Sequence, residues 1–322
     1  MGLIYSDIPE LEGSNTEISL ANLSEIEGQI EGVIEKRLAH LSELADAILK
    51  DGEDADVIKS ILLSIRSEGK ADSGNVIDEN RHAADEIFSR MSLIERLYLF
   101  KETFERLSIE KKELFKQYWN EDDIEVTAEA SERIAYLKNS YTDSVYLQFS
   151  SLLSSPRAAY FGSIVDVCES VYNGSCEYCI LPIETAADGR LLSFYELILK
   201  YGFRINAVYD LGLDGGYTRY ALLSKRFAAY DNSLRSKARN RYFEFIMTGS
   251  ETVSIEELLC ASSFCSLKLR RIDTFNFHPE KIGNHPCVCP IFRVDGSDMV
   301  TFLSFLVIDC PDFIPIGLYM QI

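Results

Sequence analysis

The sequence predicts an α+β protein of three parts: an all-α N-terminal domain (residues 1–125), an α/β single lobe (residues 130–228) and a C-terminal ferredoxin-like βαββαβ domain (residues 238–322). Three observations lead to this prediction. The first part carries apolar residues at helical spacing and no segment of strand character. The middle part alternates short apolar strands with helices. The last part follows the split βαββαβ order.

Composition and charge limit the function classes. A chain of 322 residues is long enough for two or three domains, and an apolar share of 47% is typical of a folded protein. No leader segment and no run of about 18 apolar residues occurs, so we expect a cytoplasmic protein without a membrane span. The formal net charge of -19 repels phosphate backbones and anionic membrane surfaces, so we expect neither nucleic acid nor membrane as a partner.

The eight cysteines are scattered and lack the paired spacing of a zinc site or a disulfide scaffold. One pair, Cys176 and Cys179, has the C-x-x-C spacing that can bind metal or exchange disulfides. Because Cys179 lies in the apolar strand pattern "YCILPI", we predict core packing for it. No metal and no cofactor is expected.

In the first part, apolar residues recur every three or four positions between Ile26 and Ile48, which predicts one long helix ending near Asp51. Three further helices are predicted at residues 55–67, 78–90 and 92–119. In the middle part, strands are predicted for "RIAYL", "YCILPIE", "RINAVYDL" and "TRYALLSK", and a strand or loop for "AAYFGS". Helices are predicted between them for "SVYLQFSSLL" (residues 144–153), "IVDVCESVYNG" and "RLLSFYELILKYG". This alternation predicts a mostly parallel sheet that is covered on both faces.

The last part reads strand "RYFEFIMTG", helix "SIEELLCASSF", strands "SLKLRRIDTF" and "VCPIFRV", helix "DMVTFLSFLVID" and strand "IPIGLYMQI". This order is the basis for the predicted βαββαβ domain.

The middle part resembles prephenate dehydratase in the order and spacing of three motifs. Thr142 and Ser144 match the family's A-Y-L-G-P-x-G-T-F-S loop, where Lys138 and Tyr141 replace glycines and Asp143 replaces an aromatic residue. Pro182-Ile183-Glu184 match its P-I-E-N-S turn, and Thr218-Arg219 match its T-R-F ending. These segments border the substrate in that family. The resemblance therefore implies Thr218 as a catalytic residue and the following residues as substrate-binding: Thr142, Ser144, Glu184, Thr185 and Arg219.

One departure from that family concerns the stretch "YDLGLDGGYTRYALLSK". The family inserts a second lobe between the two strands that correspond to "RINAVYDL" and "TRYALLSK", whereas here only "GLDGG" joins them. We predict a tight glycine hairpin and one remaining lobe of prephenate dehydratase type. A site open to water on one side weakens the electrostatic contacts that catalysis needs, so we expect dehydratase activity to be lost.

The first part is similar to the chorismate mutase domain that often precedes the dehydratase. "VIDENRHAADEIFSRM" resembles the family's V-Y-D-P-x-R-E turn, with His82 in place of the glutamate. The resemblance implies catalytic roles for Arg81 and Lys112 and substrate-binding roles for Arg37, Asp78 and His82. The rearrangement of chorismate needs cations that hold two carboxylates in a compact conformer. The alternative is that these residues form solvated helix faces.

The last part resembles an ACT domain, through its element order and the ending "IPIGLY". The segments that bind phenylalanine in that family read "GSETVS" and "RIDTFNFHP" here, which argues against the same ligand site. Dimerisation through sheet edges or helices requires only the fold of such a domain and not its ligand site, so we expect a homodimer.

Two functional hypotheses follow. The first is a chorismate mutase/prephenate dehydratase-family protein of phenylalanine biosynthesis that recognises a small dicarboxylate such as chorismate or prephenate, with mutase activity favoured over dehydratase activity. The alternative is a noncatalytic ligand-binding or regulatory protein that retains the same architecture. The missing lobe and His82 favour the alternative. Asp78, Arg81 and the Thr218-Arg219 pair favour recognition of a ligand.

Overall fold

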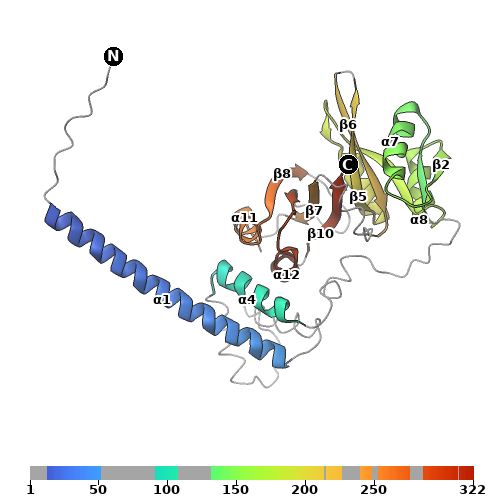
Figure 1. Cartoon of the computed structure of the whole chain (residues 1–322). Helices are drawn as coiled ribbons and strands as arrows, with labels where there is room; N and C mark the ends of the chain where they lie inside the picture. Colours follow the sequence, from blue (N-terminus) through green and yellow to red (C-terminus); the bar gives the residue numbers. More distant parts are fainter. Residues whose placement is uncertain are drawn as a thin grey trace, which may run out of the picture.

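The computed structural model describes residues 13–51, 91–107, 132–213, 215–226, 240–248, 253–275, 286–310 and 312–322. Within these residues the chain is a mixed α/β protein with helices packed on a ten-stranded sheet (Figure 1). The helices predicted at residues 55–67 and 78–90, and the end of the one predicted at residues 92–119, lie outside the described residues.

The two described N-terminal helices are α1 (Gly13–Asp51) and α4 (Leu93–Arg106). Helix α4 begins with a capping box, in which the Ser92 hydroxyl accepts from the Glu95 amide and the Glu95 carboxylate accepts from the Ser92 amide. Buried residues of both helices, such as Ala45 and Phe100, share one hydrophobic cluster with the C-terminal helices. The N-terminal helices are therefore anchored to the C-terminal part of the chain.

The middle part alternates strands and helices as predicted. The strands are β1 (Arg133–Leu137), β2 (Arg157–Phe161), β3 (Tyr178–Thr185), β4 (Gly189–Arg190), β5 (Arg204–Leu213) and β6 (Gly216–Ser224). The helices are α7 (Ser140–Ser150), α8 (Ile164–Tyr172) and α9 (Leu192–Tyr201). Strands β1, β2 and β3 are parallel, and β6 lies antiparallel between β3 and β5.

Local sequence explains where these helices begin and end. Helix α7 begins at residue 140, earlier than the predicted 144, because Asn139 and Thr142 form a capping box. Helix α9 ends at Gly202, whose φ of 68° lies in the left-handed region that glycine adopts without a Cβ penalty. Buried residues on the two faces of the sheet form separate clusters, one with α7 and one with α8 and α9. The prediction that both faces of the sheet are covered is confirmed for this part. The prediction of a mostly parallel sheet is wrong, because β6 is antiparallel to both β3 and β5, and β4 is antiparallel to β3.

The last part consists of β7 (Asn240–Thr248), α11 (Ile255–Phe264), β8 (Lys268–Phe275), β9 (Cys287–Arg293), α12 (Met299–Asp309) and β10 (Ile314–Gln321). This is the predicted βαββαβ element order. The strands lie in the order β10-β7-β9-β8, and each neighbouring pair is antiparallel.

A feature that the sequence analysis does not anticipate is the joint between the middle and last parts. Strand β10 pairs in parallel with β5, with Gly317 opposite Ile205. The full sheet therefore runs β2-β1-β3-β6-β5-β10-β7-β9-β8, with β4 on β3. We call the β5–β10 joint the seam. The two predicted domains share one sheet, and their buried residues meet in one cluster around it, including Val208 and Ile316.

Cys179 is buried, as predicted for a core residue, and Cys176 is buried as well. Burial raises the pKa of the Cys179 thiol well above its ordinary value, which keeps it protonated and unreactive. Among the described residues no cluster of three or more His, Cys, Asp or Glu side chains is placed to hold a metal ion. None of the described helices combines the length and the hydropathy that a bilayer crossing requires.

Candidate functional site

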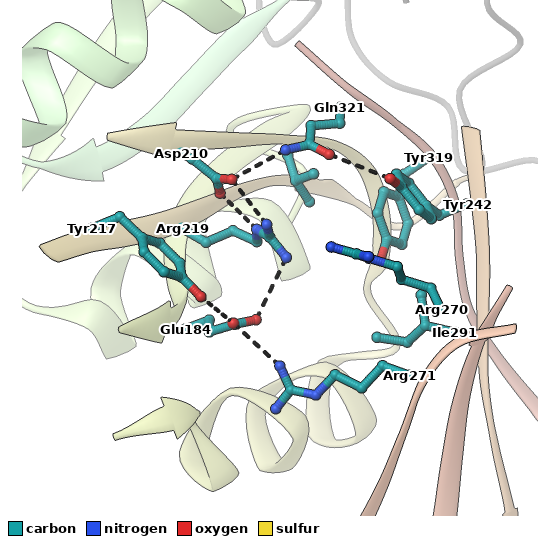
Figure 2. A pocket seen from close by; sticks show the side chains of 11 residues that line it. Glu184, Asp210, Tyr217, Arg219, Tyr242, Arg270, Arg271, Ile291, Tyr319 and Gln321 are labelled. Atoms are coloured by element: carbon teal, nitrogen blue, oxygen red, sulfur yellow. Dashed lines mark hydrogen bonds and ion pairs between the residues drawn. The ribbon is translucent and has the colours of Figure 1, made fainter. Parts of the chain in front are cut away.

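A cavity of about 410 Å³ lies at the seam, where strands of the middle and last parts meet (Figure 2). Its lining comes from β3, β5 and β6 on one side and from β7, β8, β9 and β10 on the other. The lining residues combine arginines, carboxylates and tyrosines: Glu184, Val208, Asp210, Tyr217, Arg219, Tyr242, Arg270, Arg271, Ile291, Tyr319 and Gln321.

Arg219 lies in the middle of three adjacent strands, opposite Glu184 on β3 and Asp210 on β5. A bulge in β3 between Pro182 and Glu184 sets this register. The Nε and Nη2 atoms of Arg219 donate to the two oxygens of Asp210 at 2.6 and 2.8 Å. The hydrogen bond to Asp210 raises the pKa of Arg219, so this guanidinium is charged and already held by a carboxylate of the chain.

Glu184 is almost fully buried at the base of the cavity. It accepts a hydrogen bond of 2.6 Å from the Tyr217 hydroxyl and one of 3.2 Å from Arg271 Nη1. Burial raises the pKa of Glu184, but the Tyr217 hydroxyl and the guanidinium groups of Arg190, Arg219 and Arg271 outweigh it and bring the pKa below its ordinary value. Glu184 is therefore a carboxylate whose charge is compensated inside the protein.

Strand β8 supplies two consecutive arginines. Arg271 donates from Nε to Asp273 at 2.6 Å and from Nη1 to Glu184. Figure 2 shows that the guanidinium of Arg270 extends from β8 into the cavity, toward Arg219 on the other side. No carboxylate among the described residues pairs with Arg270. Of the described arginines that line the cavity, Arg270 is therefore the one open to an external anion.

The remaining wall is apolar and aromatic. The rings of Tyr242 and Tyr319 lie with their centroids 5.7 Å apart, beside Val208 and Ile291. Gln321 donates to Asp210 at 3.1 Å, and its Oε1 accepts from the Tyr242 hydroxyl at 3.4 Å. The cavity thus places aromatic surface next to guanidinium groups, an arrangement suited to a small anion with an apolar body.

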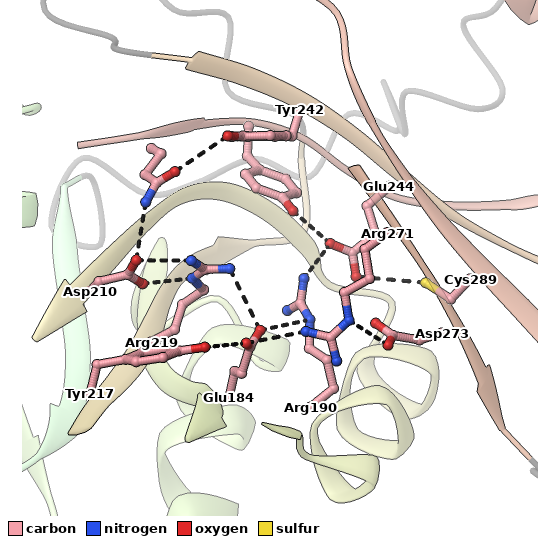
Figure 3. A network of polar contacts seen from close by, with 12 residues as sticks. Glu184, Arg190, Asp210, Tyr217, Arg219, Tyr242, Glu244, Arg271, Asp273 and Cys289 are labelled. Carbon is pink, nitrogen blue, oxygen red and sulfur yellow. Dashed lines mark hydrogen bonds and ion pairs between the residues drawn. The ribbon is translucent and has the colours of Figure 1, made fainter. Parts of the chain in front are cut away.

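Behind the cavity lies a fully buried polar network (Figure 3). Glu244 on β7 accepts hydrogen bonds of 2.9 Å from Arg190 Nη2, 2.7 Å from the Tyr195 hydroxyl and 2.8 Å from the Tyr319 hydroxyl. Arg190 Nε also lies 3.4 Å from Glu184. This network connects the two parts across the seam and fixes the base of the cavity.

The structure brings together two of the predicted site residues, Glu184 and Arg219. The hydroxyl of Thr142 donates to the Leu137 carbonyl within the helix cap, and Ser144 donates to the Ser140 carbonyl at 3.0 Å. Neither lines the cavity.

Two further predicted residues face each other across β3 and β6, since Thr185 pairs with Thr218 in the strand register. Thr185 donates to Asp188 at 2.9 Å in the turn after β3. Neither threonine lines the cavity.

Of the predicted residues in the first part, Arg37 is described. Its side chain is 57% exposed, and its guanidinium forms an ion pair with Glu95 of α4. Asp78, Arg81, His82 and Lys112 lie outside the described residues, so their roles stay predictions.

The sequence did not predict seven polar residues of the cavity lining: Asp210, Tyr217, Tyr242, Arg270, Arg271, Tyr319 and Gln321. The consecutive arginines in "SLKLRRIDTF" would point to opposite faces of a regular strand, so only an irregularity lets both line one cavity. The register shows a bulge there, with Leu269 opposite Phe292 and Arg271 opposite Ile291, so that Arg270 is the extra residue.

The fold and the cavity together describe a mixed α/β protein with a cationic cavity beside aromatic side chains. No protein family model matches the sequence, and no curated protein matches it. Solved structures are similar at low identity. Prephenate dehydratase from Streptococcus mutans has 16% identity and a TM-score of 0.47, covering 59% of this chain and 99% of that one.

Two other solved structures are similar to the same degree. Prephenate dehydratase from Arthrobacter aurescens, in complex with L-Phe, has 11% identity and a TM-score of 0.45 over 58% of this chain and 89% of that one. GqqA, described as a novel type of quorum quenching acylase, has 14% identity and a TM-score of 0.45 over 59% of this chain and 95% of that one.

Proposed function

We propose that this protein is a noncatalytic ligand-binding or regulatory protein that takes a small carboxylate in the seam cavity. The observation that carries the proposal is Arg270, a guanidinium that points into the cavity and pairs with no carboxylate of the described residues (Figure 2). Arg219 and Arg271 stand beside it. Although the chain has a net charge of -19, charges beyond about 10 Å are largely screened in physiological salt, so the local cations decide which ion binds.

The geometry argues against dehydratase chemistry. Loss of water and carbon dioxide from prephenate needs a hydroxyl donor beside the departing oxygen in a site that excludes water. The candidate donor Thr218 does not line the cavity, and the hydroxyls of Thr142 and Thr185 are bonded within the chain. Strands β5 and β6 pair continuously as far as Leu213 and Gly216, at the position where the dehydratase family inserts its second lobe.

The place of the protein in aromatic amino acid biosynthesis is part of the proposal. It is supported by the sequence resemblance in Pro182-Ile183-Glu184 and Thr218-Arg219, whose charged members pair in the structure. A second candidate function, chorismate mutase activity, is favoured by the Asp78-x-x-Arg81 motif. The pairing of Arg37 with Glu95 on the surface weakens that candidate, because this cation is already engaged.

The test combines binding and turnover. Calorimetric titration of the full chain with a panel of small mono- and dicarboxylates is expected to show binding that weakens as salt rises. Incubation with prephenate is expected to yield no phenylpyruvate above the spontaneous rate, and incubation with chorismate no prephenate. Enzymatic formation of either product would overturn the noncatalytic proposal. A flat titration for every member of the panel would overturn the binding site.

A further inference from the structure

We propose that the seam cavity selects a monocarboxylate with a flat aromatic body and no ammonium group, and that Arg270 holds the carboxylate. This inference rests on the proposed binding function and specifies its ligand. It follows from how the charges and hydrogen-bond acceptors around the cavity are already used by the chain.

The charge of the cavity favours a single negative charge. Asp210 occupies two donor atoms of Arg219, while Asp273 and Glu184 occupy Arg271. Of the arginines in the described cavity lining, Arg270 is the one that forms no ion pair with a carboxylate. One bound carboxylate neutralises it. A second carboxylate on the ligand would lie near Asp210 or Glu184 without a cation of its own, and repulsion would disfavour it.

The carboxylates of the cavity are already paired with arginines of the chain, so none is left unpaired for an ammonium group. Asp210 Oδ1 accepts from Arg219 Nε, and Oδ2 accepts from Arg219 Nη2 and Gln321 Nε2. Glu184 Oε1 accepts from Tyr217 and Arg271, and Oε2 is closed to solvent. An ammonium would therefore add positive charge beside Arg270 without gaining a carboxylate partner. The chemistry fits a 2-oxo, hydroxy or simple carboxylic acid better than an amino acid.

The side chains next to Arg270, on the same side of the cavity, favour a ligand with an aromatic body. Tyr242 and Tyr319 present neighbouring rings beside Val208 and Ile291, and aromatic rings attract each other at centroid distances of about 4.5–7 Å. A cavity of about 410 Å³ holds a molecule of this kind with its carboxylate at Arg270. Figure 2 shows both features together, with the rings and the Arg270 guanidinium facing one cavity.

The experiment uses three probes that share one benzyl body. 3-Phenylpropanoate carries a single carboxylate, L-phenylalanine adds an ammonium, and benzylsuccinate adds a second carboxylate. By titration calorimetry of the full chain we expect 3-phenylpropanoate to bind about tenfold or more tightly than either of the others, the scale of one charge-assisted hydrogen bond. Equal or tighter binding of L-phenylalanine would overturn the exclusion of ammonium. Equal or tighter binding of benzylsuccinate would overturn the inference that the cavity prefers a ligand with a single negative charge.

Variants locate the binding site. Arg270→Gln is expected to weaken 3-phenylpropanoate binding about tenfold or more, and Lys268→Gln, an exposed residue on the same strand outside the cavity lining, is expected to leave it unchanged. Thermal melts confirm that both variants fold. Unchanged binding in Arg270→Gln would overturn the role of Arg270. If none of the three probes binds but another carboxylate does, the inference fails and the proposed function stands. If no carboxylate binds, both fail.

Discussion

Arg271 on β8 forms an ion pair of 3.2 Å with Glu184 on β3, although 87 positions separate the two residues in the chain. The contact crosses the cavity from the last part of the chain to the middle part (Figure 2). Glu184 also lies within 3.5 Å of guanidinium atoms of Arg190 and Arg219. The Glu184 carboxylate therefore pairs with cations from both sides of the seam. Its ionisation is for this reason linked to the stability of the seam.

The first prediction concerns pH. Burial raises the pKa of Glu184, but Tyr217 and the three arginines bring it below its ordinary value of 4.5. A lowered pKa in the folded state means that the ionised group stabilises the fold above the unfolded pKa, and that this contribution is lost as pH falls through the folded pKa. Glu184→Gln should therefore lower the free energy of unfolding at pH 7. Below about pH 4.5, the free energy of unfolding of this variant should fall less steeply than that of the parent protein. Urea unfolding as a function of pH measures both.

The matched control for this prediction is Glu256→Gln, an exposed carboxylate at the start of α11. It should follow the pH dependence of the parent protein. A Glu184→Gln variant with the same acid decline as the parent would contradict the assigned pKa.

The second prediction concerns the buried network. Arg190 and Glu244 have side chains that are 2% and 0% exposed, and they pair at 2.9 Å. Removing one partner leaves a buried charge uncompensated, which typically costs about 3–5 kcal/mol. We expect Arg190→Met to lose stability on this scale in urea unfolding, and Arg190→Met with Glu244→Gln to lose less than the single variant. Arg293→Met, from an exposed pair with Asp295, should lose less than about 1 kcal/mol. Equal losses for the buried and exposed pairs would contradict the role given to the network.

The order of helices and strands could be predicted from the sequence because each element has its own local signal. The stripe of α1 has helical spacing, Gly202 ends α9, and "YCILPI" is an apolar strand. The hairpin between β5 and β6 was also predictable, because Gly215 and Gly216 mark a tight turn.

The seam and the cavity could not be predicted in this way. Pairing of β5 with β10 joins residues more than a hundred positions apart, and nothing in either strand specifies its neighbour. Arg190 reads as the start of a helix in "RLLSFYELILKYG" but lies in β4. Its burial depends on Glu244, which a local pattern does not connect to it. The two motifs that did lead to the cavity, around Glu184 and Arg219, were found through a family resemblance.

The third prediction tests the seam itself. A Cβ atom on Gly317 would lie 2.7 Å from Ile205 Cβ and 2.9 Å from the Ile205 carbonyl oxygen on the paired strand. Because backbone cannot yield as a flexible side chain does, Gly317→Ala should separate β10 from β5 and cost about 1–3 kcal/mol. Hydrogen exchange of β10 amides should increase as well. Gly212→Ala on β5 has no atom within 4 Å of the added Cβ and serves as the control. Unchanged stability and exchange in Gly317→Ala would argue against the seam.

The last prediction concerns assembly. Leu23, Ile26, Ile30 and Val33 on α1 are each at least 50% exposed and follow the alternating spacing of three and four residues that is typical of a coiled-coil seam. Figure 1 shows this half of α1 extending away from the sheet. Contiguous exposed apolar residues of this kind favour association, so we expect a homodimer by light scattering at micromolar concentration. Ile26→Lys with Ile30→Lys should give a monomer, because two charges would be buried in the contact, whereas Glu31→Gln, outside the stripe, should remain a dimer. A monomeric parent protein would rule out this role for α1, and a dimer that survives the double lysine variant would place the contact elsewhere.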